Sequence, residues 1–403
     1  MQAIESGYSG WLGGSTVLNY RTGALGYSQL AAIEAPFEAS AHLGYSARIT
    51  AIARPVFLDS GQADGTAVIS VLESTVSGSA LTAIPEPIGT LTATNVIPPA
   101  QQNAVGIGGE LQLAFPHFAI AGGYKPYNFL VANFTGRLVW KPGNGPFTFS
   151  LTRDSIKDSQ LSYAGLRDPG LANLSSPGPI WGGVVANQGQ VQFAHGDAQS
   201  GYYFNAGGQY ITGYHVLNNN RIDGNGGAYW RVFTSPEYGA LSVGANFFAM
   251  RYANNQNAFT HGMGGYFSPQ GYFLANVPFT WEGHYINRWH YNIMGAVGAQ
   301  GFQENSAPLW PLAGDKPLEI AQNNPRLPDV TTVSGNYDVR SQVAYQFSPH
   351  WFVGGYLAAN NSRDYTSTSV GFFVRFMFRE QPSTATNPTG LFPWDGMRPF
   401  TVP

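Results

Sequence analysis

The sequence predicts an all-β fold, a 16-stranded antiparallel transmembrane β-barrel of the outer-membrane type with long extracellular loops. Apolar and polar residues alternate with a period of two, which separates them onto the two faces of a strand. The alternating segments run for about 10 to 14 residues, roughly twice the usual strand length. Charged residues are only 11% of the 403 residues, too few to solvate an ordinary protein surface of this size.

Residues 337–347 show the alternation most clearly. Tyr337 and Val339 fall on an apolar face, whereas Asp338 and Arg340 fall on a polar one. The stretch 180–195 could be divided at residues 187–189, which would give seventeen strands. Left whole, it is one of sixteen predicted strands, at residues 5–18, 27–40, 44–57, 103–115, 117–126, 128–140, 146–154, 180–195, 201–215, 221–233, 238–252, 271–282, 287–301, 334–347, 350–361 and 367–378.

A soluble β-sandwich would show the same alternation, with its apolar face turned inward. The long strands and the scarcity of charge favour a barrel in lipid instead. Aromatic residues near strand ends favour it too, because the interfacial girdles of membrane barrels lie there. The residues in question are Trp140, Trp230, Trp281, Trp289, Trp351 and Phe378.

The connections between the predicted strands differ in length between the two rims. The long connections, at residues 59–102, 155–179, 253–270 and 302–333, all fall at one rim, and short turns fall at the other. Bacterial outer-membrane barrels show this asymmetry, with long extracellular loops and short periplasmic turns. The pattern therefore predicts periplasmic chain termini.

Sixteen strands leave an aqueous channel, whereas eight are filled by their own side chains. Charged residues on the polar faces could simply line a wet lumen and pair with one another across strands. Aromatic rings on the same faces suggest a sugar path, since rings stack on flat sugar faces while amides and charges bond the hydroxyl groups. The substrate-path candidates are Tyr203, Tyr229, Arg231, Phe248, Tyr272, Asp338, Arg340, Tyr356 and Arg375.

Arg375 lies in the middle of an apolar strand. A lipid-facing arginine at mid-membrane costs about 2–4 kcal/mol, so we expect Arg375 in the lumen, near inward polar groups such as Asn360. The barrel would thus comprise residues 1–378. Residues 379–403 are too rich in Pro, Ser and Thr for a strand, but their second half is apolar. We expect a periplasmic tail that docks at the barrel mouth or inside the lumen as a plug.

Several functional classes lack support in the sequence. There is no catalytic, nucleotide-binding or metal-binding motif, so we expect no enzyme activity, no cofactor and no metal. A net charge of −3 without a basic run argues against nucleic acid as a partner. The first residues lack the basic and apolar regions of a signal peptide. We expect a chain that follows a removed signal or forms the C-terminal part of a longer export product.

Two long loops carry apolar residues that a solvated loop would not need. The stretches are DSIKDSQLSYAGLRDPG at 154–170, followed by IWGGVV at 180–185, and FTHGMGGYFSPQGYF at 259–273. Such loops are expected to pack over or into the pore mouth. Together with the tail, they supply the candidate gate residues Tyr163, Trp181, Tyr266, Phe267 and Trp394.

Several of these motifs, taken in order, resemble the C-terminal domain of cellulose synthase operon protein C. The motifs are the loop stretches above with EAPFEA at 34–39, GAYWR at 227–231 and FFAMRY at 247–252. The resemblance implies a passive outer-membrane channel that exports nascent cellulose. It also implies outer-membrane lipid, a periplasmic tetratricopeptide-repeat region and the inner-membrane synthase complex as partners. The loops at 59–102 and 302–333 depart from the family pattern.

Three alternatives remain open at this point. An exporter of another exopolysaccharide is the first, although a polyanionic polymer would favour a basic lumen over the mixed charges found here. A general sugar porin is the second, and it predicts uptake of small solutes without a synthase. A barrel enzyme is the third, and it predicts hydrolytic turnover by the purified chain.

Overall fold

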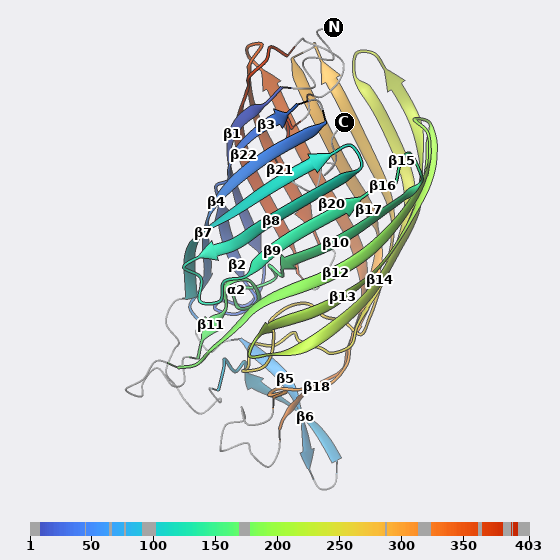
Figure 1. Ribbon diagram of the computed structural model, residues 1–403. Coiled ribbons are helices and arrows are strands. Elements are labelled where there is room, and N and C mark those ends of the chain that lie inside the picture. Colours follow the sequence, from blue (N-terminus) through green and yellow to red (C-terminus); the bar gives the residue numbers. More distant parts are fainter. Residues whose placement is uncertain are drawn as a thin grey trace.

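The computed structural model describes residues 9–44, 46–63, 67–75, 78–90, 102–168, 178–286, 288–312, 324–361, 365–381, 388 and 390–393. These residues form a closed antiparallel barrel (Figure 1). The barrel has sixteen positions, called staves here, and each stave is one strand or two consecutive half-strands. The first and last strands pair along their whole length, from Trp11 opposite Met377 to Arg21 opposite Ser367, and this pairing closes the barrel.

The staves follow one another around the barrel in chain order. They are β1 (Trp11–Arg21), β2 (Leu30–Glu34) with β3 (Phe37–Leu43), β4 (Ala47–Gly61), β7 (Gln102–Phe115), β8 (Phe118–Tyr127), β9 (Phe134–Trp140), β10 (Phe147–Ser155), β12 (Ile180–Gly196), β13 (Ser200–Tyr214), β14 (Val216–Ser235), β15 (Gly239–Tyr252), β16 (Gly271–Tyr285), β17 (Trp289–Glu304), β20 (Val330–Gln346), β21 (Trp351–Asn360) and β22 (Ser367–Met377). Strands β2 and β3 are two halves of one stave, since both pair with β1 and β4.

Each predicted strand overlaps one stave, and the stretch 180–196 forms a single strand. The largest differences lie in two places. The first stave begins at Trp11 rather than at residue 5, and β9 begins at Phe134 rather than at residue 128. Residues 128–133 leave the sheet because Phe129 packs against a loop inside the barrel and the Val131 N–H donates to the carbonyl of Ala164.

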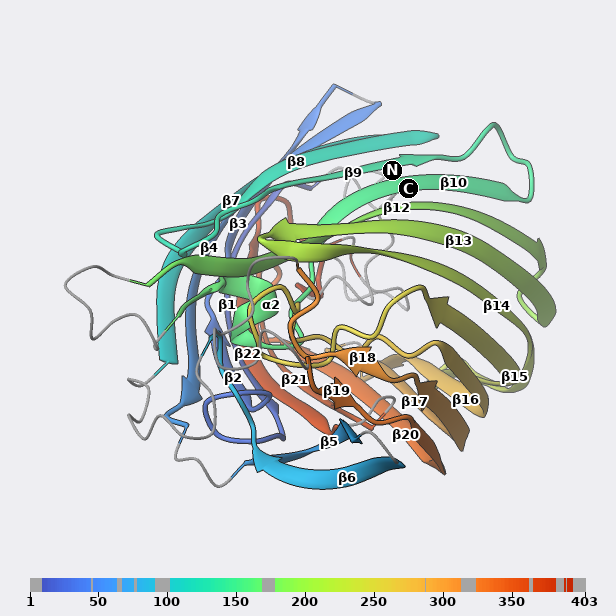
Figure 2. The same cartoon turned by 90° about the horizontal axis from the view of Figure 1, so that it is seen from below.

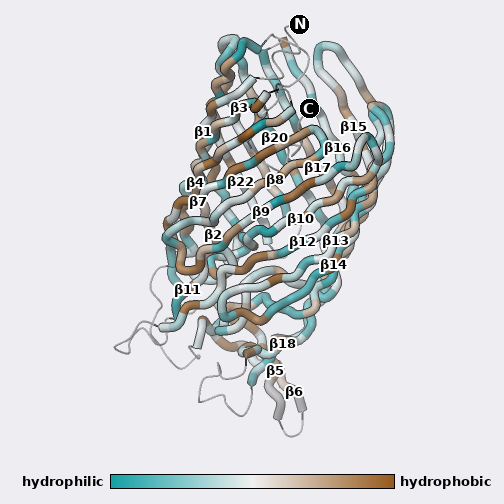
Figure 3. The backbone as a smooth tube through the Cα atoms, in the orientation of Figure 1, coloured by the Kyte–Doolittle hydropathy of each residue, from teal (hydrophilic) through white to brown (hydrophobic). Residues whose placement is uncertain are grey.

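The two faces of the barrel wall have opposite character. On β22, Val370 and Phe372 are 53% and 56% exposed, whereas Phe373 and Arg375 are 0% and 1% exposed. Figure 3 shows the apolar residues along the staves. The six girdle residues predicted above are all exposed, as lipid-facing aromatic side chains would be. No helix in the described ranges is long and apolar enough to cross a membrane.

The long connections lie at one end of the barrel and carry structure of their own. Strands β5 (Val68–Thr75), β6 (Gly78–Pro85), β18 (Ala307–Pro308) and β19 (Arg326–Leu327) form a four-stranded sheet outside the barrel (Figure 1). Helix α2 (Gln160–Ala164) and strand β11 (Leu166–Arg167) belong to the connection before β12. Figure 2 shows α2 within the ring of strands.

Candidate functional site: the barrel lumen

All nine predicted lumen residues lie on the inward phase of their strands. Their neighbours show this directly: Tyr203 lies between Tyr202 and Phe204, which are 42% and 57% exposed on the outer face. Likewise, Asp338 and Arg340 flank the outward Val339. The same alternation places the remaining ones inside, namely Tyr229, Arg231, Phe248, Tyr272, Tyr356 and Arg375. Their role in transport remains a prediction.

A belt of side-chain amides runs along one side of the lumen. The Tyr203 hydroxyl donates to Asn246 Oδ1 at 2.9 Å, and Asn246 Nδ2 donates to Asn276 Oδ1 at 3.1 Å. Asn276 Nδ2 in turn lies 3.4 Å from Asn336 Oδ1. This amide belt, formed by Tyr203, Asn246, Asn276 and Asn336, spans staves β13 to β20. It presents neutral donors and acceptors of the kind that bond sugar hydroxyl groups.

Two links of the amide belt skip a strand, and a glycine makes each one possible. Gly227 lies between Tyr203 and Asn246 in the sheet register, and Gly298 lies between Asn276 and Asn336. A Cβ on Gly227 would lie 2.5 Å from the Tyr203 hydroxyl oxygen, and one on Gly298 would lie 2.6 Å from Asn276 Cβ. Any larger residue would therefore separate the bonded pairs.

Arg375 lies in the lumen wall as predicted, but its partner differs from the expected one. Its Nη1 lies 2.9 Å from Glu38 Oε2, and the two side chains are 1% and 4% exposed. Glu38 is two strands away, with Gly13 of β1 between them in register. Asn360 instead faces Ser367, nearer the opposite rim. The prediction of the partner was wrong because it assumed adjacent strands.

The described part of the tail packs against the lumen wall. Leu391 and Phe392 are 1% and 8% exposed and join a cluster with Trp11, Ala344, Phe352, Phe373 and Met377. Gly390 approaches Trp11 so closely that a Cβ would lie 2.5 Å from its ring, and its φ of 74° favours glycine. Trp394, predicted as a gate residue, lies outside the described residues.

The loops at the opposite end also enter the barrel. Tyr163, Trp181, Tyr266 and Phe267 are all at most 2% exposed. The connections before β12 and before β16 are joined by bonds from Ser159 Oγ to the Gly265 carbonyl, at 2.7 Å, and from the Phe267 N–H to Asp158. Burial raises the pKa of both Tyr163 and Tyr266, so both rings stay neutral over the physiological range.

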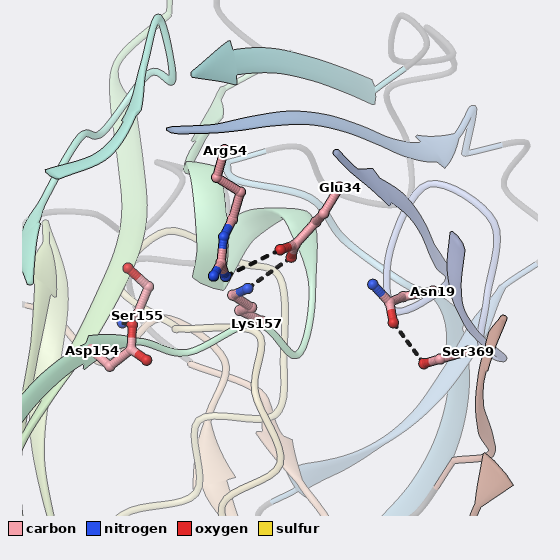
Figure 4. Close-up of polar contacts among 7 residues, drawn as sticks. All are labelled: Asn19, Glu34, Arg54, Asp154, Ser155, Lys157 and Ser369. Carbon is pink, nitrogen blue, oxygen red and sulfur yellow. Dashed lines mark hydrogen bonds and ion pairs between the residues drawn. The ribbon is translucent and has the colours of Figure 1, made fainter. Parts of the chain in front are cut away.

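An ion pair fastens the α2 connection to the barrel wall (Figure 4). Lys157 Nζ lies 2.7 Å from Glu34 Oε1, and Arg54 Nη1 lies 3.3 Å from Glu34 Oε2. Glu34 ends β2, directly before the break at Pro36. Sequence alternation placed Glu34 on the polar face, but nothing in it pointed to Lys157, which is 123 residues away.

The described residues hold no group of three or more His, Cys, Asp or Glu side chains placed to bind a metal ion. The fold and the lumen define a class: a 16-stranded barrel of the outer-membrane type. Its lumen is lined by the amide belt and by charged pairs, and segments pack at both ends of it.

Comparisons with known proteins narrow this class. Residues 28–379 match the family described as the C-terminus of cellulose synthase operon protein C, and the chain belongs to that family. A protein of that name from Pseudomonas fluorescens (strain SBW25) is 27% identical over 365 residues, which are 89% of this chain and 26% of that protein. One from Komagataeibacter xylinus is 33% identical over 261 residues, 60% of this chain and 19% of that protein.

The chain thus spans about a quarter or less of the length of these relatives. Among solved structures, a protein titled bacterial polysaccharide outer membrane secretin superposes with a TM-score of 0.53 at 9% identity. The alignment covers 92% of this chain and 99% of that one. At this identity the likeness concerns the barrel fold alone.

Proposed function

We propose that this chain is an outer-membrane channel through which nascent cellulose, a β-1,4-glucan, leaves the bacterial cell passively. The observation that carries the proposal is the amide belt, because it offers a neutral polyol many weak hydrogen bonds and no net charge. Membership of a family named after the cellulose synthase operon supports the choice of polymer.

Three charged pairs in the lumen favour a neutral cargo over a polyanion. Glu38 pairs with Arg375, Asp338 with Arg340, and Asp223 with Arg221. A channel for an acidic polymer would instead present unneutralised cations in a ring. The paired charges give little reason to prefer export of another, acidic exopolysaccharide.

The orientation and partners follow from the same proposal. The end with the long loops faces outward, and the end where β1 begins and β22 ends faces the periplasm, as in other barrels of this type. The inner-membrane synthase delivers the polymer, and a periplasmic repeat region guides it to the barrel. Residues 379–403 act as a plug of the lumen. The packing of Leu391 and Phe392 against the inner face of the barrel wall supports this role.

The export role is tested in a cellulose-producing bacterium that carries this chain as part of its operon. Removal of the barrel should abolish cellulase-sensitive polymer outside the cell while the synthase remains active in membrane preparations. Tyr229→Ala with Tyr356→Ala should reduce export but spare synthesis. Unchanged export without the barrel would refute the proposal, and rapid uptake of small sugars by the wild type would favour a general porin.

A further inference from the structure

A cavity of about 330 Å³ lies against the lumen wall, between the α2 connection and the tail. Its wall includes Asn19 and Arg21 of β1, Glu34 of β2 and Tyr356 of β21. Tyr163 of α2 borders it, and so does Pro393 of the tail. Its volume falls within the range of about 300–1,000 Å³ typical of small-molecule sites.

Arg21 is the unusual member of this wall. The side chain is 6% exposed, and its guanidinium carbon lies 3.4 Å from the centroid of the Tyr365 ring. Within the described ranges, its Nε and Nη1 atoms have no hydrogen-bond partner. A guanidinium buried without acceptors costs free energy. Nε and Nη1 are enclosed by protein, so a ligand oxygen would meet this group at Nη2.

Asn19 is oriented in a way that adds a further donor. Ser369 Oγ donates to Asn19 Oδ1 at 2.6 Å, which fixes the amide and leaves its NH₂ group to donate elsewhere (Figure 4). Glu34 contributes carboxylate acceptors that already hold Arg54 and Lys157. Tyr356 supplies an aromatic ring, on which the flat face of a sugar can stack.

We propose that this cavity is a binding subsite for a short glucan segment. Arg21 and Asn19 donate to its hydroxyl oxygens, and Tyr356 stacks against a sugar ring. The inference rests on the proposed export function and deepens it, because it places a holding point for the chain between the α2 connection and the tail. Guanidinium–hydroxyl bonds suit this task, since an ion pair with an acidic group would hold too tightly for a moving polymer.

The test is calorimetric titration of the purified full chain with cellotetraose. Arg21→Gln should weaken binding about tenfold, the loss expected when a charged donor is removed. Asn19→Ala and Tyr356→Ala should each weaken it severalfold, while Tyr356→Phe, which keeps the ring, should bind like the wild type. Arg221→Gln is the matched control: it removes a lumen arginine from β14, away from the cavity. Heat-modifiable electrophoretic mobility verifies that each variant is folded.

The outcomes separate the subsite from the export function. Equal weakening by Arg21→Gln and Arg221→Gln would overturn the subsite, and so would absence of cellotetraose binding to the wild type. Arg21-dependent binding of inorganic phosphate or of an oligoglucuronate, without cellotetraose binding, would replace it by an anion site. The export function itself fails only if cells without the barrel still secrete cellulose.

Discussion

Replacing Glu38 with alanine would remove the carboxylate that Arg375 contacts inside the barrel wall. The atoms are 2.9 Å apart and both side chains are at most 4% exposed, so water screens the pair poorly. Two unit charges about 4 Å apart interact by about 4 kcal/mol at an effective dielectric constant near 20. Loss of one partner from a buried pair typically costs about 3–5 kcal/mol. We expect Glu38→Ala to lower the free energy of unfolding by about 3–4 kcal/mol.

The assay is reversible urea unfolding in lipid vesicles, followed by tryptophan fluorescence. The control is the double variant Glu38→Met with Arg375→Met, which removes both charges and should cost far less than Glu38→Ala alone. A loss below about 1 kcal/mol for Glu38→Ala would show that this pair is solvated. It would thereby refute the reasoning from burial.

Three further predictions concern the tail, the α2 connection and the amide belt. Gly390→Val should displace the tail and so raise single-channel conductance in planar bilayers, and deletion of residues 386–403 should have the same effect. Gly143→Val is the control, because it places the same backbone strain in an exposed turn and should leave the conductance unchanged. Lys157→Ala should increase the frequency of brief channel openings in the same recordings. It should lower the free energy of unfolding by at most about 1 kcal/mol, since the Lys157 side chain is 36% exposed. Channel openings as rare as in the wild type would show that the ion pair does not hold the α2 connection in place. Gly298→Ala should lower the free energy of unfolding by about 1–3 kcal/mol. Gly122→Ala has open space around it and should change that free energy by less than about 0.5 kcal/mol. Equal effects of the two variants would contradict the role of Gly298 in letting Asn276 and Asn336 meet.

Much of the barrel was predictable because period-two alternation is a local property of the chain. The phase that placed Arg375 and Tyr356 inside depends only on their immediate neighbours, and the structure has the same phase. Strand ends were less predictable where tertiary contacts intervene. Phe129 belongs to an alternating segment, yet it turns away to pack on Tyr163 with their rings 5.3 Å apart.

The pairing of lumen side chains could not be predicted, since it depends on register and on contacts across an intervening strand. Glu38 and Arg375 are 337 residues apart, and both were recognised as polar-face residues without any sign that they meet. The amide belt was missed for the same reason. Its one sequence signal is a glycine on the polar phase of a strand, as at Gly298, and that signal is informative only after the strands have been aligned.

The glycines that separate bonded side chains also bear on how the barrel is assembled. Gly13, Gly227 and Gly298 each let the strands on either side of them bond directly, so each ties three staves together at one alignment only. A slip of one strand by two residues, which keeps each side chain on its own face, would place a bulkier residue between the partners and break the contact. The contact across Gly13 spans the junction of the first and last strands. The contact between Glu38 and Arg375 therefore forms only when the first and last strands have paired in the correct register, and it stabilises the closed barrel in that register alone.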